Sequence, residues 1–147
     1  MSKSRPRDFT RRAGFLLATV GRRADTAWTG FLQGHGVTNA EFAALSVLAG
    51  ETLNQRALAE RMAVDPRNAG TVLRRLTRRG WVSTQADPTD ARCVRLSLTA
   101  DGASALDAIL EALPRERGSF FRAVSAEELL ELERILNKVN DSFMSPE

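Results

Sequence analysis

The 147-residue sequence predicts a mainly α-helical (α+β) fold in which a short basic helix is followed at once by a β-hairpin. Three observations support this prediction. Residues 65–79 have the apolar spacing of an amphipathic helix, residues 82–98 contain two alternating segments separated by a turn, and long apolar helical stripes flank this region on both sides. A basic helix followed directly by a hairpin describes a winged helix.

The helix predicted over 65–79 has two opposite faces. Apolar residues recur with i, i+3, i+4 and i+7 spacing, and a cationic stripe without an acidic residue follows the same spacing on the other side. The apolar stripe is Ala69, Val72, Leu73 and Leu76, and the cationic stripe is Arg67, Thr71, Arg74 and Arg78. Asp65 suits the N-cap, Pro66 the first helical position and Gly80 the stop.

The hairpin is predicted from strict alternation. The alternating residues are Val82, Thr84 and Ala86 in the first strand and Val94, Leu96 and Leu98 in the second. The tip, Asp87–Arg92, is rich in turn-forming residues and carries an arginine. A helix about 10–12 Å across fits a DNA major groove about 12 Å wide. With the helix in that groove, the hairpin tip can reach the adjacent minor groove.

The elements before the basic helix complete a helix-turn-helix. A long helix with one apolar stripe is predicted from about Asp8 to Gln33, and a capping box, Thr38–Glu41, opens a second helix. Asn54 caps a third helix, Gln55 to about Met62, and Ala63–Val64 forms the tight turn into the basic helix. Two short helices joined by a short turn, the second of them basic, are the helix-turn-helix pattern.

Two helices are predicted after the hairpin. Thr99 caps the first, and Pro114 is expected to end or kink it, which leaves open a polar connection or a bent continuation. A second capping box, Ser125–Glu128, opens the last helix. Its predicted inward residues are Leu129, Leu132, Ile135, Leu136, Val139 and Phe143.

The apolar stripes at both ends of the chain predict self-association. A small winged helix offers too little surface to cover them, so we expect a second copy to do so in a two-fold homodimer. The alternative is an intramolecular three-helix bundle. We therefore predict an N-terminal dimerisation helix (1–34), a winged helix-turn-helix region for DNA binding (35–99) and C-terminal dimerisation helices (100–147), intertwined as a single domain.

The charge is segregated along the chain. The net charge is +3 overall, but residues 54–99 carry +5 and residues 100–147 carry −5. A basic winged helix beside an acidic C-terminal third indicates a nucleic-acid partner, here double-stranded DNA, whereas a basic face that is only solvated is the alternative. The sequence has one cysteine, no apolar run that could span a bilayer and no signal peptide, so we expect a cytoplasmic protein without a membrane partner.

The residues do not favour an enzyme. The sequence has no glycine-rich phosphate loop, no cluster with metal-ligand spacing and no histidine near a serine or cysteine, so we predict no cofactor and no metal. The alternative function is a winged helix that binds an acidic protein partner without specific DNA binding.

Short motifs across most of the chain carry a resemblance to a known family. They are Leu58–Met62, Val64–Asn68, Arg75–Leu76, Gly80–Val82, the wing Asp87–Arg92 and Leu96–Gly102. In these motifs the sequence resembles the MarR family of bacterial transcription regulators, whose wing reads Asp-x-Arg and is followed by Leu-Thr-x-x-Gly. The resemblance implies a homodimeric winged helix-turn-helix repressor that binds a pseudopalindromic operator.

The resemblance also implies roles for single residues. Arg92 corresponds to the wing arginine that enters the minor groove, and Asp90 to the acid that orients it. The recognition helix would meet the major groove through Arg67, Asn68, Thr71 and Arg74. Many members release DNA when a small aromatic or phenolic effector binds between the dimerisation helices and the winged helix.

For several DNA-binding candidates the residues leave two roles open. Arg67 and Arg74 either read guanine or hold phosphate, and Arg75, Arg78 and Arg79 hold phosphate or cover the helix surface. Asn68 either reads adenine or completes the cap made by Asp65.

The remaining candidates lie outside the basic helix. Arg95 either contacts phosphate or covers the outer strand face, and Asn54 and Gln55 could meet a phosphate through helix N-terminal N–H groups. Cys93 is a candidate redox sensor whose pKa Arg92 and Arg95 would lower, a role that we do not favour. The candidate ligand-pocket residues, each of which has a core or helix-ending role as its alternative, are Trp28, Phe31 and His35.

Overall fold

The computed structural model describes residues 9–145, and over 114–120 it describes the backbone alone. The chain divides into two compact units, Met1–Asn39 and Ala40–Glu147. The first unit contains a 3-10 turn, η1 (Phe9–Arg11), and the helix α1 (Ala13–Gln33). The second contains α2 (Asn39–Gly50), α3 (Gln55–Met62), α4 (Pro66–Arg78), β1 (Val82–Ala86), β2 (Val94–Leu98), α5 (Ala100–Phe120) and α6 (Ala126–Met144). The first residue of α2, Asn39, still belongs to the first unit.

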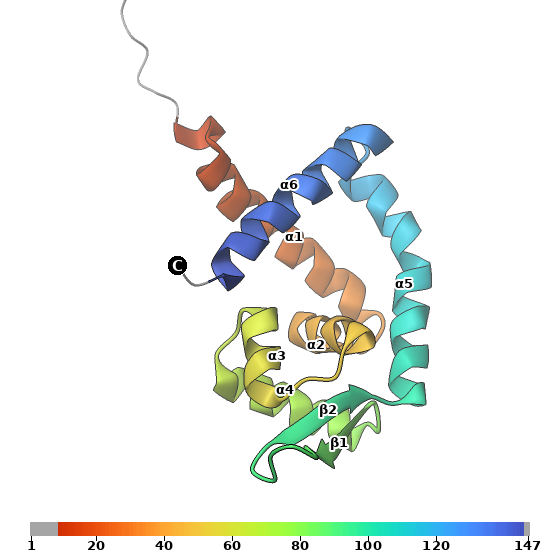
Figure 1. Ribbon diagram of the computed structural model, residues 1–147. Helices are drawn as coiled ribbons and strands as arrows, with labels where there is room; N and C mark the ends of the chain where they lie inside the picture. The colour runs from red at the N-terminus through yellow and green to blue at the C-terminus, as the bar shows by residue number, and fades with distance from the viewer. Residues whose placement is uncertain (1–8, 146–147) are drawn as a thin grey trace, which may run out of the picture. The chain divides into compact units, whose positions relative to one another are not determined.

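The predicted mainly α-helical winged helix is confirmed in the second unit. There α3 packs against α4, α4 against β1, and α3 against β2 (Figure 1). The apolar stripe of α4 faces the core of this unit, since all four of its residues are buried. They meet Leu45 and Leu48 of α2, Leu58 of α3 and Leu96 of β2, and removal of this apolar surface from water is the main stabilising contribution.

The predicted hairpin is present, and the structure gives its register. Val82 pairs with Leu98, Thr84 with Leu96 and Ala86 with Val94 in an antiparallel ladder. Sequence reasoning missed a third partner, because Leu53 forms an isolated bridge to Leu96 through two backbone hydrogen bonds of 3.2 and 2.7 Å. One residue between two helices gives no alternating pattern from which a strand could be predicted.

Local capping signals agree with the structure. The Asn54 side chain accepts the Ala57 N–H at 2.8 Å, and the Asp65 side chain accepts the Arg67 N–H at 2.8 Å. The predicted capping box at Ser125 is present, with both reciprocal hydrogen bonds to Glu128. These caps satisfy backbone donors that the first helical turn leaves without partners, so each helix begins where its cap lies.

Two boundaries differ from the expectation. The single helix predicted from Asp8 is instead a 3-10 turn followed by α1 from Ala13, and Asp8 itself lies outside the described residues. The chain continues as one helix through position 114, so of the two continuations left open after Pro114 the helical one is present. Loss of one backbone hydrogen bond at a proline does not end a helix when the neighbouring turns keep theirs.

The long flanking helices expose apolar side chains in the single chain. In α6 the predicted inward residues Ile135, Leu136 and Phe143 are 44%, 39% and 82% exposed, and in α1 the side chains of Leu17 and Val20 are 46% and 47% exposed. No helix among the described residues is long and apolar enough to cross a membrane.

Candidate nucleic-acid interface

The outward face of α4 carries the cationic stripe. Arg67, Asn68, Thr71, Arg74, Arg75 and Arg78 are all exposed, and their opposite helix face is the buried apolar stripe. Because one side of the helix packs against the core, the backbone positions of the exposed basic residues are set by that packing. This is the arrangement in which a helix presents basic side chains to a polyanion.

Hydrogen bonds within the stripe order two of these side chains. The Thr71 hydroxyl donates to the Arg67 carbonyl at 3.3 Å and accepts from Arg74 Nη2 at 3.2 Å. The Asp65 carboxylate accepts the N–H of Arg67, and within the part of the chain that the structure describes no hydrogen bond joins the Asn68 side chain to this cap.

The start of α3 lies beside the start of α4. Gln55 Nε2 donates to the Pro66 carbonyl at 3.3 Å and passes over Gly70, where a Cβ would lie 3.0 Å from that nitrogen. The Asn54 side chain is engaged in the cap of α3, so it contributes to any surface contact mainly through the helix N-terminus. The structure thus brings both residues to the N-terminal end of the basic helix.

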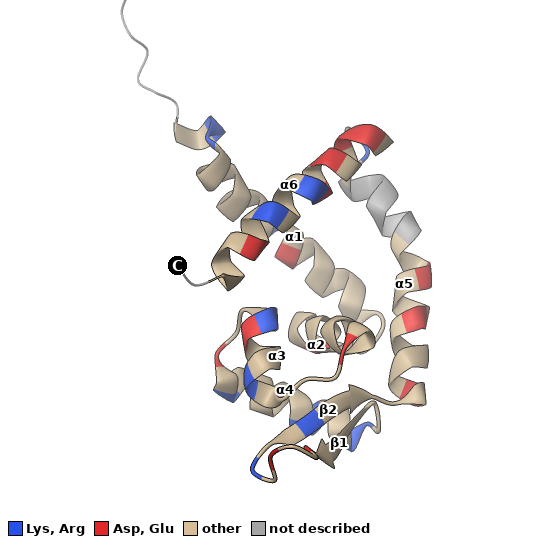
Figure 2. Ribbon diagram, viewed as in Figure 1, with Lys and Arg blue, Asp and Glu red and all other residues tan. Residues whose placement is uncertain are grey.

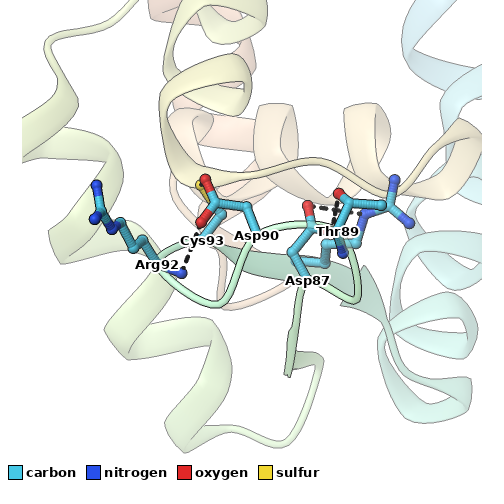
Figure 3. A network of polar contacts seen from close by, with 6 residues as sticks. Asp87, Thr89, Asp90, Arg92 and Cys93 are labelled. Carbon is cyan, nitrogen blue, oxygen red and sulfur yellow. Dashed lines mark hydrogen bonds and ion pairs between the residues drawn. The ribbon is translucent and has the colours of Figure 1, made fainter.

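The wing is shaped by a polar network at its tip (Figure 3). Asp87 Oδ1 accepts the Thr89 hydroxyl at 2.7 Å and the Thr89 N–H at 2.8 Å, and these bonds lower the pKa of the Asp87 carboxyl below its ordinary value. Arg95 lies 3.8 Å from the same carboxylate, so this arginine belongs to the base of the wing. The tip therefore has a defined shape although it is exposed.

Asp90 contacts Arg92 through the backbone of the wing tip. Its Oδ1 accepts the backbone N–H of Arg92 at 3.0 Å, and the Arg92 guanidinium extends away from this carboxylate (Figure 3). Asp90 therefore orders the backbone beneath Arg92, and among the described residues the guanidinium has no partner that would hold it back.

The expectation that neighbouring arginines lower the pKa of Cys93 is wrong. The thiol lies 3.6 Å from Asp90 Oδ2, and the negative charge of Asp90, with a smaller effect of burial, raises the pKa of the Cys93 thiol above its ordinary value. The turn places this carboxylate beside the thiol. A thiol with a raised pKa is a poor nucleophile at neutral pH, which speaks against a redox sensor here.

A groove of about 500 Å³ lies between α4 and the strands of the wing. Its walls include Leu73, Arg74 and Arg78 from α4 and Thr84 and Val94 from the strands. The groove has an apolar floor with two arginines at its edge. Figure 2 shows basic residues in blue at the wing tip and on β2, whereas acidic residues in red recur along α5.

The three candidate pocket residues lie in the first unit. The Trp28 and Phe31 ring centroids are 5.6 Å apart, and those of Phe31 and His35 are 5.0 Å apart. All three side chains are half-buried, so they form a continuous row of rings at the end of α1. Among the described residues, no group of three or more His, Cys, Asp or Glu could hold a metal ion.

Sequence reasoning missed one charged pair. Glu41 is buried, with 5% of its surface exposed, and its Oε2 lies 3.4 Å from Arg79 Nη1. The sequence signal for a buried charged pair was an acidic residue among the apolar residues of α2.

Comparisons with known proteins point to one family. Residues 35–92 match the family model described as MarR family. This segment contains α2, α3, α4 and most of the wing. A probable transcriptional regulator from Pseudomonas aeruginosa is 28% identical, with 88% of this chain and 97% of that chain covered and a TM-score of 0.74. Over residues 35–92 the chain is therefore similar to the MarR family.

Two further MarR-type structures are similar. MarR from E. coli in complex with operator DNA is 26% identical over 86% of this chain and 91% of that one, with a TM-score of 0.73. BpsR from Bordetella bronchiseptica, whose DNA binding is regulated by 6-hydroxynicotinic acid, shares the fold at 23% identity, 93% and 99% coverage and a TM-score of 0.78. A search of curated sequences gave no match.

The matched proteins are transcriptional regulators, one of them in complex with operator DNA, and this similarity supports DNA-binding transcriptional regulation and not catalysis. The fold and the basic interface agree with this assignment.

Proposed function

We propose that this protein binds a pseudopalindromic operator as a homodimer and acts as a repressor, with α4 in the major groove and the wing in the adjacent minor groove. One observation carries the proposal. The exposed face of α4 is a cationic stripe without an acidic residue, and it leads directly to a wing with an exposed arginine at its tip.

On α4 we assign base reading to the N-terminal side chains. Arg67, Asn68 and Arg74 are exposed, and an arginine that pairs with guanine discriminates by about 1–3 kcal/mol. Thr71 holds Arg74 in place through their hydrogen bond, which reduces the entropy that Arg74 loses on binding. Arg75 and Arg78, further along the helix, are assigned to phosphates.

We assign Arg92 to the minor groove. Its guanidinium extends from a tip whose backbone is already ordered by Asp90, and a narrow A·T-rich minor groove attracts arginine through its enhanced negative potential. The DNA backbone that separates the major from the minor groove would lie in the protein groove between α4 and the wing. Arg74 and Arg78 flank this protein groove, and its apolar floor suits deoxyribose. The N-terminus of α3, which begins with Gln55, would meet the same strand.

The homodimer is supported by the exposed apolar residues of the flanking helices. Residues at 135, 136 and 139 of α6 and at 16, 17 and 20 of α1 are more than a third exposed in the single chain. Contiguous apolar surface of this kind marks an interaction site. We therefore propose residues 1–34 and 100–147 as the dimerisation helices and residues 35–99 as the DNA-binding region.

Regulation by a small aromatic or phenolic effector is part of the proposal. The row formed by Trp28, Phe31 and His35 supports it, because aromatic rings with one polar edge suit an aromatic ligand. Successive major grooves are about 34–36 Å apart, so a DNA-binding dimer must place its two α4 helices at this distance. The effector would favour a dimer with a different distance between them. We propose the cytoplasm as the compartment in which such a regulator acts.

The test uses the full-length protein and two duplexes of equal length. One duplex is the DNA upstream of its own coding region and the other is a scrambled sequence, each titrated at two salt concentrations by fluorescence anisotropy. Tight, salt-sensitive binding to the upstream duplex with weak binding to the scrambled one is expected. Equal weak binding to both at every salt concentration, or a monomer at micromolar concentration in analytical ultracentrifugation, would contradict the proposal.

A further inference from the structure

The chain turns sharply after α4, and the contacts that hold this corner play no part in the proposed DNA interface. After the last turn, Gly80 adopts a positive φ of 75°, which reverses the chain direction, and the Trp81 N–H donates to the Leu76 carbonyl at 3.0 Å. Arg79 lies at this corner. Its guanidinium carbon is 3.8 Å from the centroid of the Trp81 ring.

Arg79 is also tied to α2. Its Nη1 lies 3.4 Å from Oε2 of Glu41, the buried acidic residue of that helix. A charged partner offsets part of the loss of hydration that a buried carboxylate suffers. Arg75 and Arg78, by contrast, are exposed, and among the described residues their side chains have no hydrogen-bond or ion-pair partner.

The start of α5 contacts the same corner. The Thr99 hydroxyl donates to the Gly80 carbonyl at 2.6 Å, and the Thr99 N–H donates to the Trp81 carbonyl at 3.0 Å. At Gly102, in the first turn of α5, a Cβ would lie 2.2 Å from the Trp81 carbonyl oxygen, so only glycine allows this approach. The end of α4 is therefore joined to α2 through Arg79 and to α5 through Thr99 and Gly102.

We propose that Glu41, Arg79 and Trp81 form a clamp that fixes the C-terminal end of α4, and that Arg79 is a positioning residue and not a DNA contact. The clamp sets the direction in which α4 presents its exposed arginines. This inference rests on the proposed function in so far as α4 is the helix that reads DNA. The arginines of this region then have two different roles, since Arg75 and Arg78 face phosphate whereas Arg79 faces the protein.

The DNA experiment compares Arg79→Gln, Glu41→Gln and, as the matched control, Arg78→Gln on the upstream and scrambled duplexes. Arg79→Gln is expected to weaken specific binding by roughly threefold to thirtyfold, the range for residues that act without touching the ligand. It should leave the slope of log affinity against log salt unchanged. Arg78→Gln should reduce that slope by about 0.9, as expected for one lost phosphate contact.

Glu41→Gln separates the clamp from simple electrostatics by the sign of its effect. Removal of a negative charge on its own strengthens attraction to DNA, whereas the clamp predicts weaker specific binding, about as weak as for Arg79→Gln. The double variant should lose no more than either single one, because both break the same pair. All variants are compared at a temperature where circular dichroism reports a folded protein. Should Glu41→Gln not fold, Trp81→Leu replaces it, and the same weakening is expected.

Hydrogen exchange of the free protein tests the clamp without DNA. Arg79→Gln and Glu41→Gln should speed exchange of the amides at 79–81, while Arg78→Gln should not. Wild-type protein that bound both duplexes equally would refute the proposed function, and the exchange result would still decide the clamp. A slope reduced by about 0.9 in Arg79→Gln, wild-type specific affinity in Glu41→Gln, or unchanged exchange in both would overturn the inference.

Discussion

Replacement of Gly102 by alanine should destabilise the protein although it adds a better helix former. The new Cβ would lie 2.2 Å from the Trp81 carbonyl oxygen and 2.9 Å from Leu98 Cδ1, so backbone must move. Overpacking of this kind costs about 1–3 kcal/mol, and strain on the 3.0 Å bond from the Thr99 N–H to the Trp81 carbonyl adds about 0.5–1.5 kcal/mol. Removal of a helical glycine returns about 0.5–1 kcal/mol. The free energy of unfolding should therefore fall by about 0.5–4 kcal/mol.

Thermal and urea unfolding measure this loss. The melting temperature should fall by about 2–4 °C for each kcal/mol in a chain of this size. Gly50→Ala is the matched control, because Gly50 is also helical and a Cβ there would meet nothing within 4 Å. All proteins are compared at one concentration, since dimerisation would make stability concentration-dependent. A Gly102→Ala protein as stable as wild type would refute the packing argument.

Three further predictions concern the turn in the helix-turn-helix, the corner after α4 and the wing. Ala63 has left-handed backbone angles (φ 55°, ψ 42°), so Ala63→Gly should raise the free energy of unfolding by up to about 1 kcal/mol in urea denaturation, and an unchanged or lower value would contradict this. Gly80→Ala, at φ 75° with open space around it, should lower the same quantity by about 1 kcal/mol, and a more stable variant would show that the strain argument fails. Asp90→Asn removes the charge that raises the pKa of Cys93, so the thiolate fraction and the rate of alkylation by iodoacetamide at pH 7.5 (about neutral, where a thiol is mostly protonated) should increase. Asp107→Asn, on α5, is the control, and equal rates in both variants would exclude the assigned cause.

Features encoded by neighbouring residues were predictable from the sequence. The N-caps at Asn54, Asp65 and Ser125, the alternation within each strand and the burial of one face of α4 all depend on residues a few positions apart. Hydrophobic spacing and side-chain caps act within one or two turns, so they leave a readable pattern. The winged helix followed from these local signals.

Features that depend on distant residues were not predictable. Glu41 and Arg79 are 38 positions apart, and no local pattern indicates that Arg79 turns away from the cationic face to meet a buried carboxylate. The pKa of Cys93 was predicted with the wrong sign because proximity in sequence favoured its arginine neighbours, whereas the folded turn places the Asp90 carboxylate beside the thiol. In both cases the side-chain direction decides the chemistry, and that direction is set by tertiary packing.

The central claim is that α4 and the wing form the DNA interface, and the salt dependence of Arg92→Ala tests it most directly. Affinity for the upstream duplex is measured at four or more salt concentrations (about 50–200 mM, where phosphate contacts dominate the salt effect) for wild type, Arg92→Ala and Arg134→Ala. Arg134, on α6, pairs with Glu131 at 2.7 Å and serves as the control for loss of one positive charge. We predict a slope about 0.9 smaller for Arg92→Ala and wild-type behaviour for Arg134→Ala. Equal slopes and affinities for Arg92→Ala and wild type would contradict the claim.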